Sequence, residues 1–349
     1  MKIAILSPVA WRTPPVHYGP WELIASGVAE GLVNRGLDVT LFATANSITS
    51  ARLEAVCPQG YEEDRTLDAK VMECMHISNL MEQAHQFDII HNHFDFLPLT
   101  YSRLIRTPMV TTIHGFSSEK IVPVFERYND ISHYVAISEA NRHPALQYAA
   151  TVYNGIDPRQ FDYQPEPEDY LLFFGRFHPH KGAHDAISIA QLTGRKLIMA
   201  GIVQDETYFR EQIAPHIDGE RVQYVGAAGS EERNRLLGNA YALLHPIYFD
   251  EPFGLSVAEA MMCGTPVIAY NRGSMPELIK SGETGYLVKD AATAAAAVTD
   301  IAAIDRQQCR NWALSRFSVD SMVDDYLAVY ERVLRKASPA GVKAGAMLR

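Results

Sequence analysis

The sequence predicts an α/β protein built from two facing Rossmann-like, doubly wound domains with a cleft between them. Short apolar runs such as KIAIL and DVTLFAT alternate with stretches of helical periodicity, which is typical of parallel sheets covered by helices on both faces. The alternation restarts after residues 154–169, a segment rich in proline and acidic residues that we interpret as a linker. The length of 349 residues also favours two domains of about 150 to 200 residues.

The first half contains five apolar runs that we interpret as buried strands. We expect these strands at residues 2–6, 38–44, 88–93, 108–115 and 133–138. Helical patterns at about 22–35 and 66–86 connect some of them, so the crossovers are long enough for parallel pairing.

The second half repeats this organisation. Strands are expected at 170–175, 196–201, 221–226, 241–246, 267–270 and 285–289. Helices are expected at about 183–192, 206–217 and 230–239, with another that begins near Gly254. A last helix, at about 319–334, has apolar residues at helical spacing and should therefore pack against one of the domains.

Composition excludes several classes of protein. The net charge of -10 argues against a general nucleic-acid binder. The four cysteines have no C-x-x-C spacing, so we expect neither a zinc site nor disulfides, and a reducing cytoplasm fits. The N-terminus reads as a strand and not as a secretion signal, and no apolar run is long enough to span a membrane. The basic residues after Glu331 allow at most a peripheral membrane contact.

The stretch EPFGLSVAEAMMCGTPVIAY places two glutamates, Glu251 and Glu259, on either side of a predicted helix start. Glu259 lies about 7 Å along the helix axis, and the free N–H groups of the first turn fall between the two carboxylates. Those N–H groups and the helix dipole favour an anion. The pattern therefore suits an extended ligand with phosphates in its middle and sugars at its ends, such as a nucleotide sugar. The alternative is that Glu251 is a solvated loop residue and Glu259 faces water on an amphipathic helix, and for either glutamate alone this alternative is favoured.

The stretch FFGRFHPHKG places two cations after a predicted strand. Arg176 follows the strand directly, and Lys181 lies close to the next helix N-terminus, so both could reach one anion at the carboxyl edge of the sheet. A diphosphate is such an anion. Two solvated surface charges are the alternative.

Taken together, these patterns resemble the retaining nucleotide-sugar glycosyltransferases of family 4, which have the GT-B fold. The resemblance rests on GR-x4-KG, HP-x4-EPFGLSVAEAMMCGTPVIA, GS-x-PE and TGYLV, and on YGPWE, IIHNHFD, TTIHG and VYNGID earlier in the chain. It covers the chain from Met1 to about Leu334. It implies an acceptor-side domain formed by residues 1–153 plus 317–336, a donor-binding domain at 154–316 and a tail at 337–349.

The resemblance also implies roles for individual residues. Glu251 would hold hydroxyls of the transferred sugar, and Glu259 those of the ribose. Arg176 and Lys181 would neutralise the departing diphosphate without a metal. The remaining residues that would contact the donor are Phe253, Gly254 and Leu255, through backbone amides, and His114, against the sugar. His91 and His93 are expected to line the cleft or to pack beneath it, since two histidines without a third ligand make a poor metal site.

The first loop departs from the family pattern. Many relatives have a Gly-Gly pair where this chain has Gly19-Pro20, so one N–H is lost, although Gly19 could still approach the donor phosphate. The loop is long, polar and aromatic and follows a strand, so we interpret it as the candidate acceptor site. Its candidate residues are Arg12, His17, Tyr18 and Glu22.

These observations predict a cytoplasmic hexosyltransferase of carbohydrate biosynthesis that needs no cofactor. Its donor would be a nucleotide diphosphate sugar, UDP-glucose first and GDP-mannose second. Its acceptor would be the hydroxyl of a small molecule, a glycan or a lipid-linked sugar, and retention is implied by the resemblance. Two alternatives stay open: a GT-B sugar-nucleotide epimerase or hydrolase, and a nucleotide-sugar-binding protein without turnover.

Overall fold

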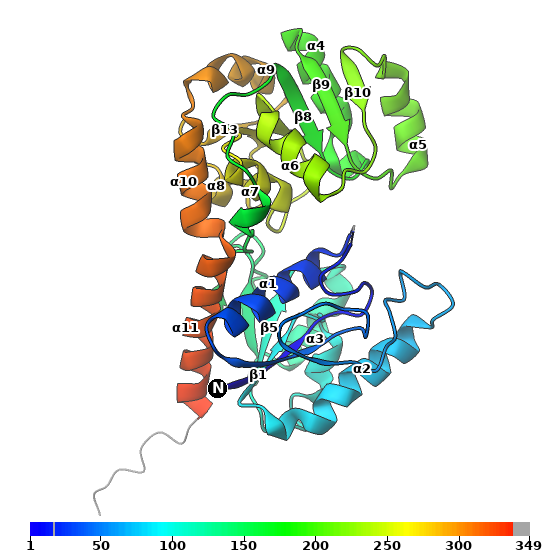
Figure 1. Cartoon of the computed structure of the whole chain (residues 1–349), viewed down its shortest axis with the longest axis vertical. Helices are drawn as coiled ribbons and strands as arrows, with labels where there is room; N and C mark the ends of the chain where they lie inside the picture. The colour runs from blue at the N-terminus through cyan, green and yellow to red at the C-terminus, as the bar shows by residue number, and fades with distance from the viewer. Residues whose placement is uncertain (17, 338–349) are drawn as a thin grey trace, which may run out of the picture. The chain divides into compact units, whose positions relative to one another are not determined.

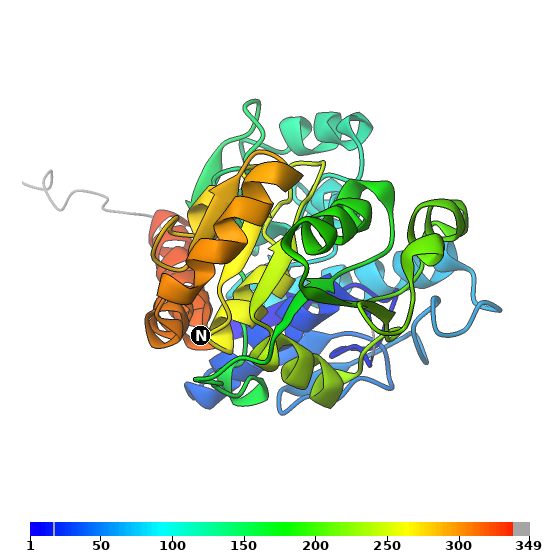
Figure 2. The same cartoon turned by 90° about the horizontal axis from the view of Figure 1, so that it is seen from above.

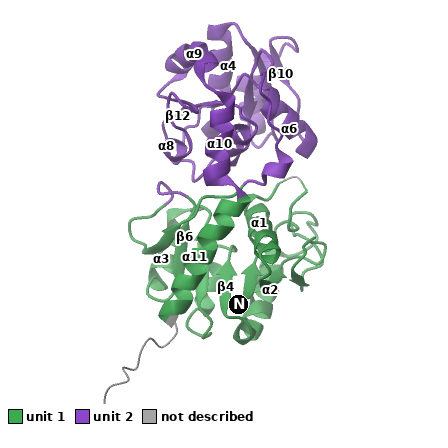
Figure 3. Cartoon of the chain, turned by 60° about the vertical axis from the view of Figure 1, so that its left-hand side comes forward, with its two compact units in different colours: residues 1–137, 142–155, 319–349 green, residues 138–141, 156–318 purple. Residues whose placement is uncertain are grey.

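The structure is a computed structural model that describes residues 1–16 and 18–337 (Figure 1). The chain forms two compact units, which Figure 3 distinguishes by colour. Unit 1 contains Met1–Ile137, Arg142–Gly155 and the described part of Val319–Arg349. Unit 2 contains Ser138–Asn141 and Ile156–Ser318. The last helix of the chain therefore belongs to the same unit as the first strand.

Unit 1 is built on a parallel sheet with the strand order β3-β2-β1-β4-β5-β6-β7. Its strands are β1 (Lys2–Leu6), β2 (Asp38–Phe42), β3 (Arg52–Glu54), β4 (Ile89–Asn92), β5 (Met109–Ile113), β6 (His133–Ala136) and β7 (Tyr148–Thr151). The central strands β1, β4 and β5 are buried along nearly their whole length because helices cover both faces of a parallel sheet. Ile3 and Leu6 of β1, for example, are fully buried.

The helices of unit 1 flank this sheet. They are α1 (Pro20–Asn34), α2 (Ala69–Gln83), α3 (Val122–Arg127) and α11 (Val319–Ala337). α11 packs beside α1, where Gly31 leaves room for Val323. Tyr326 hydrogen-bonds to Thr112 at 2.7 Å, and Tyr330 to His91 at 2.6 Å. The last helix therefore packs against one of the domains, as expected, and the domain is the one to which the resemblance assigned residues 317–336.

Unit 2 repeats the arrangement with the strand order β10-β9-β8-β11-β12-β13, again all parallel. Its strands are β8 (Tyr170–Phe174), β9 (Lys196–Ala200), β10 (Val222–Tyr224), β11 (Ala242–His245), β12 (Val267–Tyr270) and β13 (Gly285–Val288). Each sheet is thus doubly wound, as expected. The strand order reverses between β1 and β4 in unit 1 and between β8 and β11 in unit 2. Ligands of doubly wound sheets bind at the carboxyl ends of the strands at this reversal.

Unit 2 has seven α-helices. They are α4 (Ala183–Thr193), α5 (Glu206–Tyr208), α6 (Ser230–Asn239), α7 (Leu255–Met262), α8 (Met275–Leu278), α9 (Ala291–Asp300) and α10 (Arg306–Phe317). Of these, α4, α7 and α9 pack on the sheet of the unit. α4, in green, and α9, in orange, lie side by side (Figure 2). α7 and α10 pack against each other. The short α7 follows β11 and begins close to the reversal point.

Two expectations about the helices need correction. The single helix expected at about 206–217 is instead α5 followed by a π-helical turn at Phe209–Ile213 and a 3-10 turn at Ala214–His216. Pro215 explains the break, since it lacks an N–H and its ring would clash with the carbonyl of the preceding turn. The last helix continues to Ala337, beyond its expected end. Residues 338–349, most of the expected tail, lie outside the described residues.

Candidate active site

The loop after β8 carries the two cations that the sequence singled out. Arg176 follows Gly175 at the end of β8, and Lys181 closes the 3-10 turn Pro179–Lys181 just before α4. Gly182 then adopts a left-handed conformation with φ 69°, and a Cβ atom there would overlap the carbonyl oxygen of Pro246. This close backbone approach brings Lys181 beside the chain that leaves β11.

Lys181 forms an ion pair with Glu251. The side chains are mostly buried, 14% exposed for Lys181 and 15% for Glu251. His245, the last residue of β11, places Nε2 3.7 Å from Glu251 Oε2. The ammonium group also lies 4.8 Å from the centre of the Phe249 ring. Two segments that are distant in sequence, the loop after β8 and residues 245–251 at and after the end of β11, therefore meet at the strand-order reversal of unit 2.

The neighbours of Glu251 keep its carboxyl group ionised. Burial alone would raise the pKa of Glu251, but the positive charge of Lys181 and the proximity of His245 lower it to about 2. Burial lowers the pKa of His245, so this imidazole is neutral at pH 7. Glu251 is thus a buried carboxylate that can accept hydrogen bonds, and hydroxyl groups are suitable donors.

Gly254 is the N-cap residue directly before α7 and has a left-handed conformation with φ 92°. A Cβ atom on Gly254 would lie 2.7 Å from Met275 Cε, so a larger residue would be crowded as well as strained. The amides of Leu255 and Ser256, in the first turn, have no intrahelical acceptor. Phe253 is buried, and its carbonyl oxygen accepts a hydrogen bond from Ser274 Oγ at 2.7 Å. These contacts fix the turn that precedes the helix.

Glu259, one turn into α7, has a cationic partner that the sequence did not suggest. Its Oε1 lies 3.3 Å from Arg233 NH1 on α6. Burial raises the pKa of Glu259, while the charge of Arg233 opposes the rise. The Arg233 guanidinium also lies over the ring of Phe161. The two glutamates of the motif therefore lie in separate ion pairs. Glu251 pairs with Lys181 before α7 begins, and Glu259 pairs with Arg233 within α7.

Arg176 does not share the partner of Lys181. Its guanidinium donates a hydrogen bond to Gln204 Oε1 at 2.6 Å, and its side chain is half-buried. The sequence grouped Arg176 with Lys181 and placed Glu251 at the sugar. In the structure Lys181 pairs with that glutamate, whereas Arg176 bonds to Gln204, a residue that follows the neighbouring strand β9.

Glu277, in the expected motif GS-x-PE, has a structural role within unit 2. Its carboxylate accepts backbone hydrogen bonds from Glu139 and Ala140, both at 2.8 Å. Ser138 Oγ donates a hydrogen bond to the Pro252 carbonyl at 2.6 Å. These bonds explain why residues 138–141 belong to unit 2.

In unit 1, His114 directly follows β5 and is 8% exposed. The ring of Trp21 on α1 stacks on it, with centroids 5.4 Å apart and an interplanar angle of 18°. On the inner side, His114 Nε2 lies 3.0 Å from His93 Nδ1. His91 and His93 are fully buried, so they pack beneath the surface, one of the two placements expected for them.

The first loop of unit 1 is anchored by Glu22. This carboxyl group is 3% exposed, its Oε1 accepts the Trp11 N–H at 3.3 Å, and burial raises its pKa to about 7. Gly19 has φ 144° and lies against the same carboxyl group. The acceptor-binding role expected of Glu22 would require an opening of this buried site, and it stays a prediction.

The other candidates in the loop are more accessible. Tyr18 is 41% exposed and meets the Trp11 ring edge-on. Arg12 is half-buried and donates a hydrogen bond to the Pro14 carbonyl at 3.1 Å. His17 lies outside the described residues.

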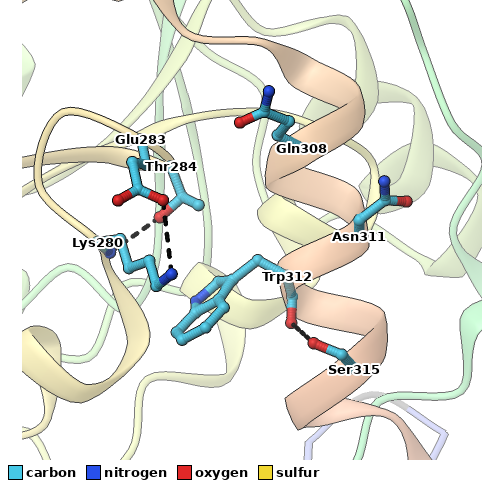
Figure 4. Close-up of a pocket in the computed structure, with 7 residues that line it drawn as sticks. All are labelled: Lys280, Glu283, Thr284, Gln308, Asn311, Trp312 and Ser315. Carbon is cyan, nitrogen blue, oxygen red and sulfur yellow. Dashed lines mark hydrogen bonds and ion pairs between the residues drawn. The ribbon is translucent and has the colours of Figure 1, made fainter.

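Two pockets lie outside the cluster of Lys181 and Glu251. Figure 4 shows one of about 280 Å³ between the segment 280–284 and α10, lined by Lys280, Glu283, Thr284, Gln308, Asn311, Trp312 and Ser315. The other, of about 350 Å³, lies at the carboxyl ends of β12 and β13 and includes Asp185, Tyr248 and Tyr270. Neither pocket is lined by a residue of the Lys181–Glu251 or the Arg233–Glu259 ion pair.

Within residues 1–16 and 18–337, no group of three or more His, Cys, Asp or Glu side chains could hold a metal ion. No helix in that part of the chain is long and apolar enough to cross a membrane.

Two family models together match most of the chain. The model of "Glycosyl transferases group 1" matches residues 158–313, and that of "Glycosyltransferase Family 4" matches residues 24–160. The chain belongs to the family 4 glycosyltransferases. Each model matches one half of the sequence. The match of the group 1 model contains Arg176, Lys181, Glu251 and Glu259.

Similar proteins include other glycosyltransferases. The chain is 24% identical over 335 residues to an uncharacterized glycosyltransferase of Methanocaldococcus jannaschii, covering 82% of this chain and 85% of that protein. It is 27% identical over 301 residues to the GDP-mannose:cellobiosyl-diphosphopolyprenol alpha-mannosyltransferase of Komagataeibacter xylinus, covering 74% and 75%. Among solved structures, Anabaena HepE in complex with UDP superposes with a TM-score of 0.73 at 21% identity, covering 95% and 100%. This last likeness shows the GT-B fold.

Sequence reasoning missed three residues around this glycosyltransferase's candidate sites. His245 lies in the motif HP-x4-E, whose pattern assigns it no role, although it is the basic neighbour of Glu251. Arg233 is separated from Glu259 by a strand and a loop, so no spacing rule connects them. Trp21 occurs in the quoted YGPWE, and its position at the start of a helix after a strand was the available signal.

Proposed function

We propose that this glycosyltransferase moves a hexose from a nucleoside diphosphate sugar to an acceptor hydroxyl. The observation that carries the proposal is the cluster of Lys181, Glu251 and His245 at the strand-order reversal of unit 2, just before the N-terminus of α7. The cluster offers a cation and free amides to a diphosphate and an ionised carboxylate to sugar hydroxyls.

The residues of unit 2 would act by positioning and electrostatics. Glu251 would accept hydrogen bonds from hydroxyls of the transferred sugar, and Glu259 from those of the ribose. Lys181 would share its charge between Glu251 and the diphosphate, and Arg176 would exchange Gln204 for a phosphate oxygen. The backbone N–H groups of Phe253, Gly254 and Leu255 would complete this environment. Such preplaced donors stabilise the charge that develops on a leaving group.

The reaction would break the bond between the anomeric carbon and the diphosphate oxygen and form one to the acceptor oxygen. In a retaining front-face path, the departing phosphate oxygen accepts the proton of the acceptor hydroxyl, so no protein base is needed. Side-chain cations and helix amides supply the positive charge, and we therefore expect no metal requirement.

UDP-glucose is the first donor to test and GDP-mannose the second. The Komagataeibacter enzyme is named for GDP-mannose, and the HepE structure contains UDP. The acceptor would be a small molecule, a glycan or a lipid-linked sugar. We place the activity in the cytoplasm, with at most peripheral contact with a membrane.

Incubation with each donor, with and without a panel of acceptors, tests this function through the release of free nucleotide. A transferase releases nucleotide and forms a glycoside when its acceptor is present. Acceptor-independent release indicates a hydrolase, and a changed donor sugar indicates an epimerase. Donor binding without turnover, seen as a thermal shift alone, would identify a non-catalytic binder. The Glu251→Gln variant is the control that should lose activity.

A further inference from the structure

Four rings form a column in unit 1. Their order is His91, His93, His114 and Trp21, with centroid separations of 4.0, 5.2 and 5.4 Å. His93 directly follows β4, and His114 directly follows the neighbouring β5. The column therefore runs from the buried interior of the sheet, through His114 at its carboxyl edge, to Trp21 on α1.

Only one of the two histidines can donate the hydrogen bond between His93 Nδ1 and His114 Nε2, which are 3.0 Å apart. Burial lowers the pKa of both rings, so both are neutral at pH 7. A neutral imidazole carries one N–H, and its other nitrogen is an acceptor. The direction of this single bond therefore sets the tautomers of both rings.

The far side of His93 decides the direction. Its Nε2 atom is buried and has no hydrogen-bond partner among the described residues. If His114 donated to His93, the proton of His93 would reside on Nε2 as a buried N–H without an acceptor. If His93 donates from Nδ1, Nε2 is only an unpaired lone pair. Buried N–H groups without partners are rare in proteins, so the second arrangement is favoured.

We propose that His93 is a positioning residue that holds neutral His114 in the Nδ1–H tautomer. His114 Nε2 then accepts the bond from His93, and its Nδ1–H points away from His93 as a hydrogen-bond donor. The role of His114 towards the substrate rests on the proposed function. His114 would donate to an oxygen of the substrate, a hydroxyl or phosphate oxygen, and would not serve as a general base.

His91 provides a matched comparison, because its own bonds hold it independently. Tyr330 OH lies 2.6 Å from His91 Nδ1, and His91 Nε2 lies 2.8 Å from Thr112 Oγ1. It makes no hydrogen bond to His93 or His114 within the described residues. Its replacement should therefore disturb the packing of α11 and leave the tautomer of His114 unchanged.

The direct test is ¹⁵N NMR of the wild-type protein labelled at histidine, with His114 assigned through a His114→Gln variant. The proposal predicts a pyrrole-type shift for His114 Nδ1 and a pyridine-type shift for Nε2. The reverse assignment would overturn it. This measurement needs no substrate, so its result is independent of whether the proposed donor is correct.

Variants of His93 test the positioning role. In His93→Leu, His114 should exchange between its tautomers, with averaged shifts, and kcat/KM should fall about tenfold. His93→Asn can place an amide N–H near the position of His93 Nδ1. It should therefore restore much of the single tautomer of His114 and much of kcat/KM. His91→Asn should retain the wild-type shifts of His114. Wild-type shifts and kinetics in folded His93→Leu would refute the role of His93, whatever the fate of the other variants.

Discussion

The charge of Glu251 illustrates how single residues prepare the site. The carboxylate is mostly buried, and it stays ionised because Lys181 pairs with it and His245 lies beside it. Removal of either charged partner of the ion pair would leave the other in a poorly solvated position. Substitutions here should therefore change both stability and chemistry, in proportions that differ from residue to residue.

The pH dependence of stability should report this ion pair. The pKa of Glu251 falls from 4.5 to about 2 on folding, so its contribution is fully present above pH 4.5 and is lost as the pH falls towards 2. That contribution is of the order of 3 kcal/mol. Urea denaturation of wild type and Glu251→Gln at several pH values would measure it. The difference in unfolding free energy should shift against the wild type below pH 4.5, and a difference that is constant from pH 6 to pH 3 would refute the lowered pKa.

The two cations should separate stability from turnover. Arg176→Ala and Lys181→Ala are each expected to lower kcat at least about tenfold, equal to roughly 1.4 kcal/mol of transition-state stabilisation. Lys181→Ala should also lower the melting temperature, because it leaves Glu251 buried without its cation, whereas Arg176→Ala should not. Steady-state kinetics and thermal denaturation would test both effects. Near-normal turnover in both variants would remove the phosphate-binding assignment.

At the scale of elements, the junction between β8 and α4 depends on glycine at position 182. Gly182 and Gly194 flank α4 with similar left-handed φ angles of 69° and 67°. A Cβ atom at Gly194 meets nothing within 4 Å, but one at Gly182 would overlap the Pro246 carbonyl.

Alanine at each of these positions isolates the effect of the close approach. Gly194→Ala should cost about 1 kcal/mol, the strain of a left-handed alanine. Gly182→Ala should cost about 3 kcal/mol or more, since the backbone at Pro246 must also move, and it should displace Lys181 and lower kcat. Equal losses of unfolding free energy in the two variants would show that the overlap has no effect.

The sequence predicted most elements, because strand and helix periodicities are local properties. It did not predict the irregular turns around Pro215. The residues on either side of this proline have a helical pattern, and the prediction extended one helix through it. The ion pairs of the site could not be predicted from the sequence either. Lys181 meets Glu251 only because Gly182 approaches Pro246, and Arg233 meets Glu259 only because α6 packs beside α7. Motif spacing identified the candidate residues, but tertiary packing determines which side chains form ion pairs with them.

At the scale of the whole molecule, unit 1 depends on a helix from the far end of the sequence. Apart from Ala337, whose side chain is not described, α11 buries six large residues: Met322, Val323, Tyr326, Val329, Tyr330 and Val333. Each large apolar side chain contributes about 1.5 to 3 kcal/mol when buried. A chain that ends at Ser318 should therefore expose the matching apolar surface of unit 1 and aggregate.

Solubility and size-exclusion chromatography of this shortened chain would test that dependence. Shortening the chain after Ala337 is the control, and it should leave the protein soluble and folded. A soluble, folded protein that ends at Ser318 would show that α11 is dispensable for unit 1.

The central claim is that the cluster at the β8–β11 reversal binds a nucleoside diphosphate, and calorimetric titration tests it most directly. UDP and GDP would be titrated, in the presence of EDTA, into the wild type and into the variants Arg176→Ala and Arg221→Ala. Arg221 is an exposed arginine just before β10, at the amino edge of the sheet and not at the carboxyl edge where the cluster lies. We predict that one of the two nucleotides binds the wild type without metal, that Arg176→Ala weakens binding about tenfold, and that Arg221→Ala leaves it unchanged. Binding that needs a metal, or equal affinity in all three proteins, would contradict the account.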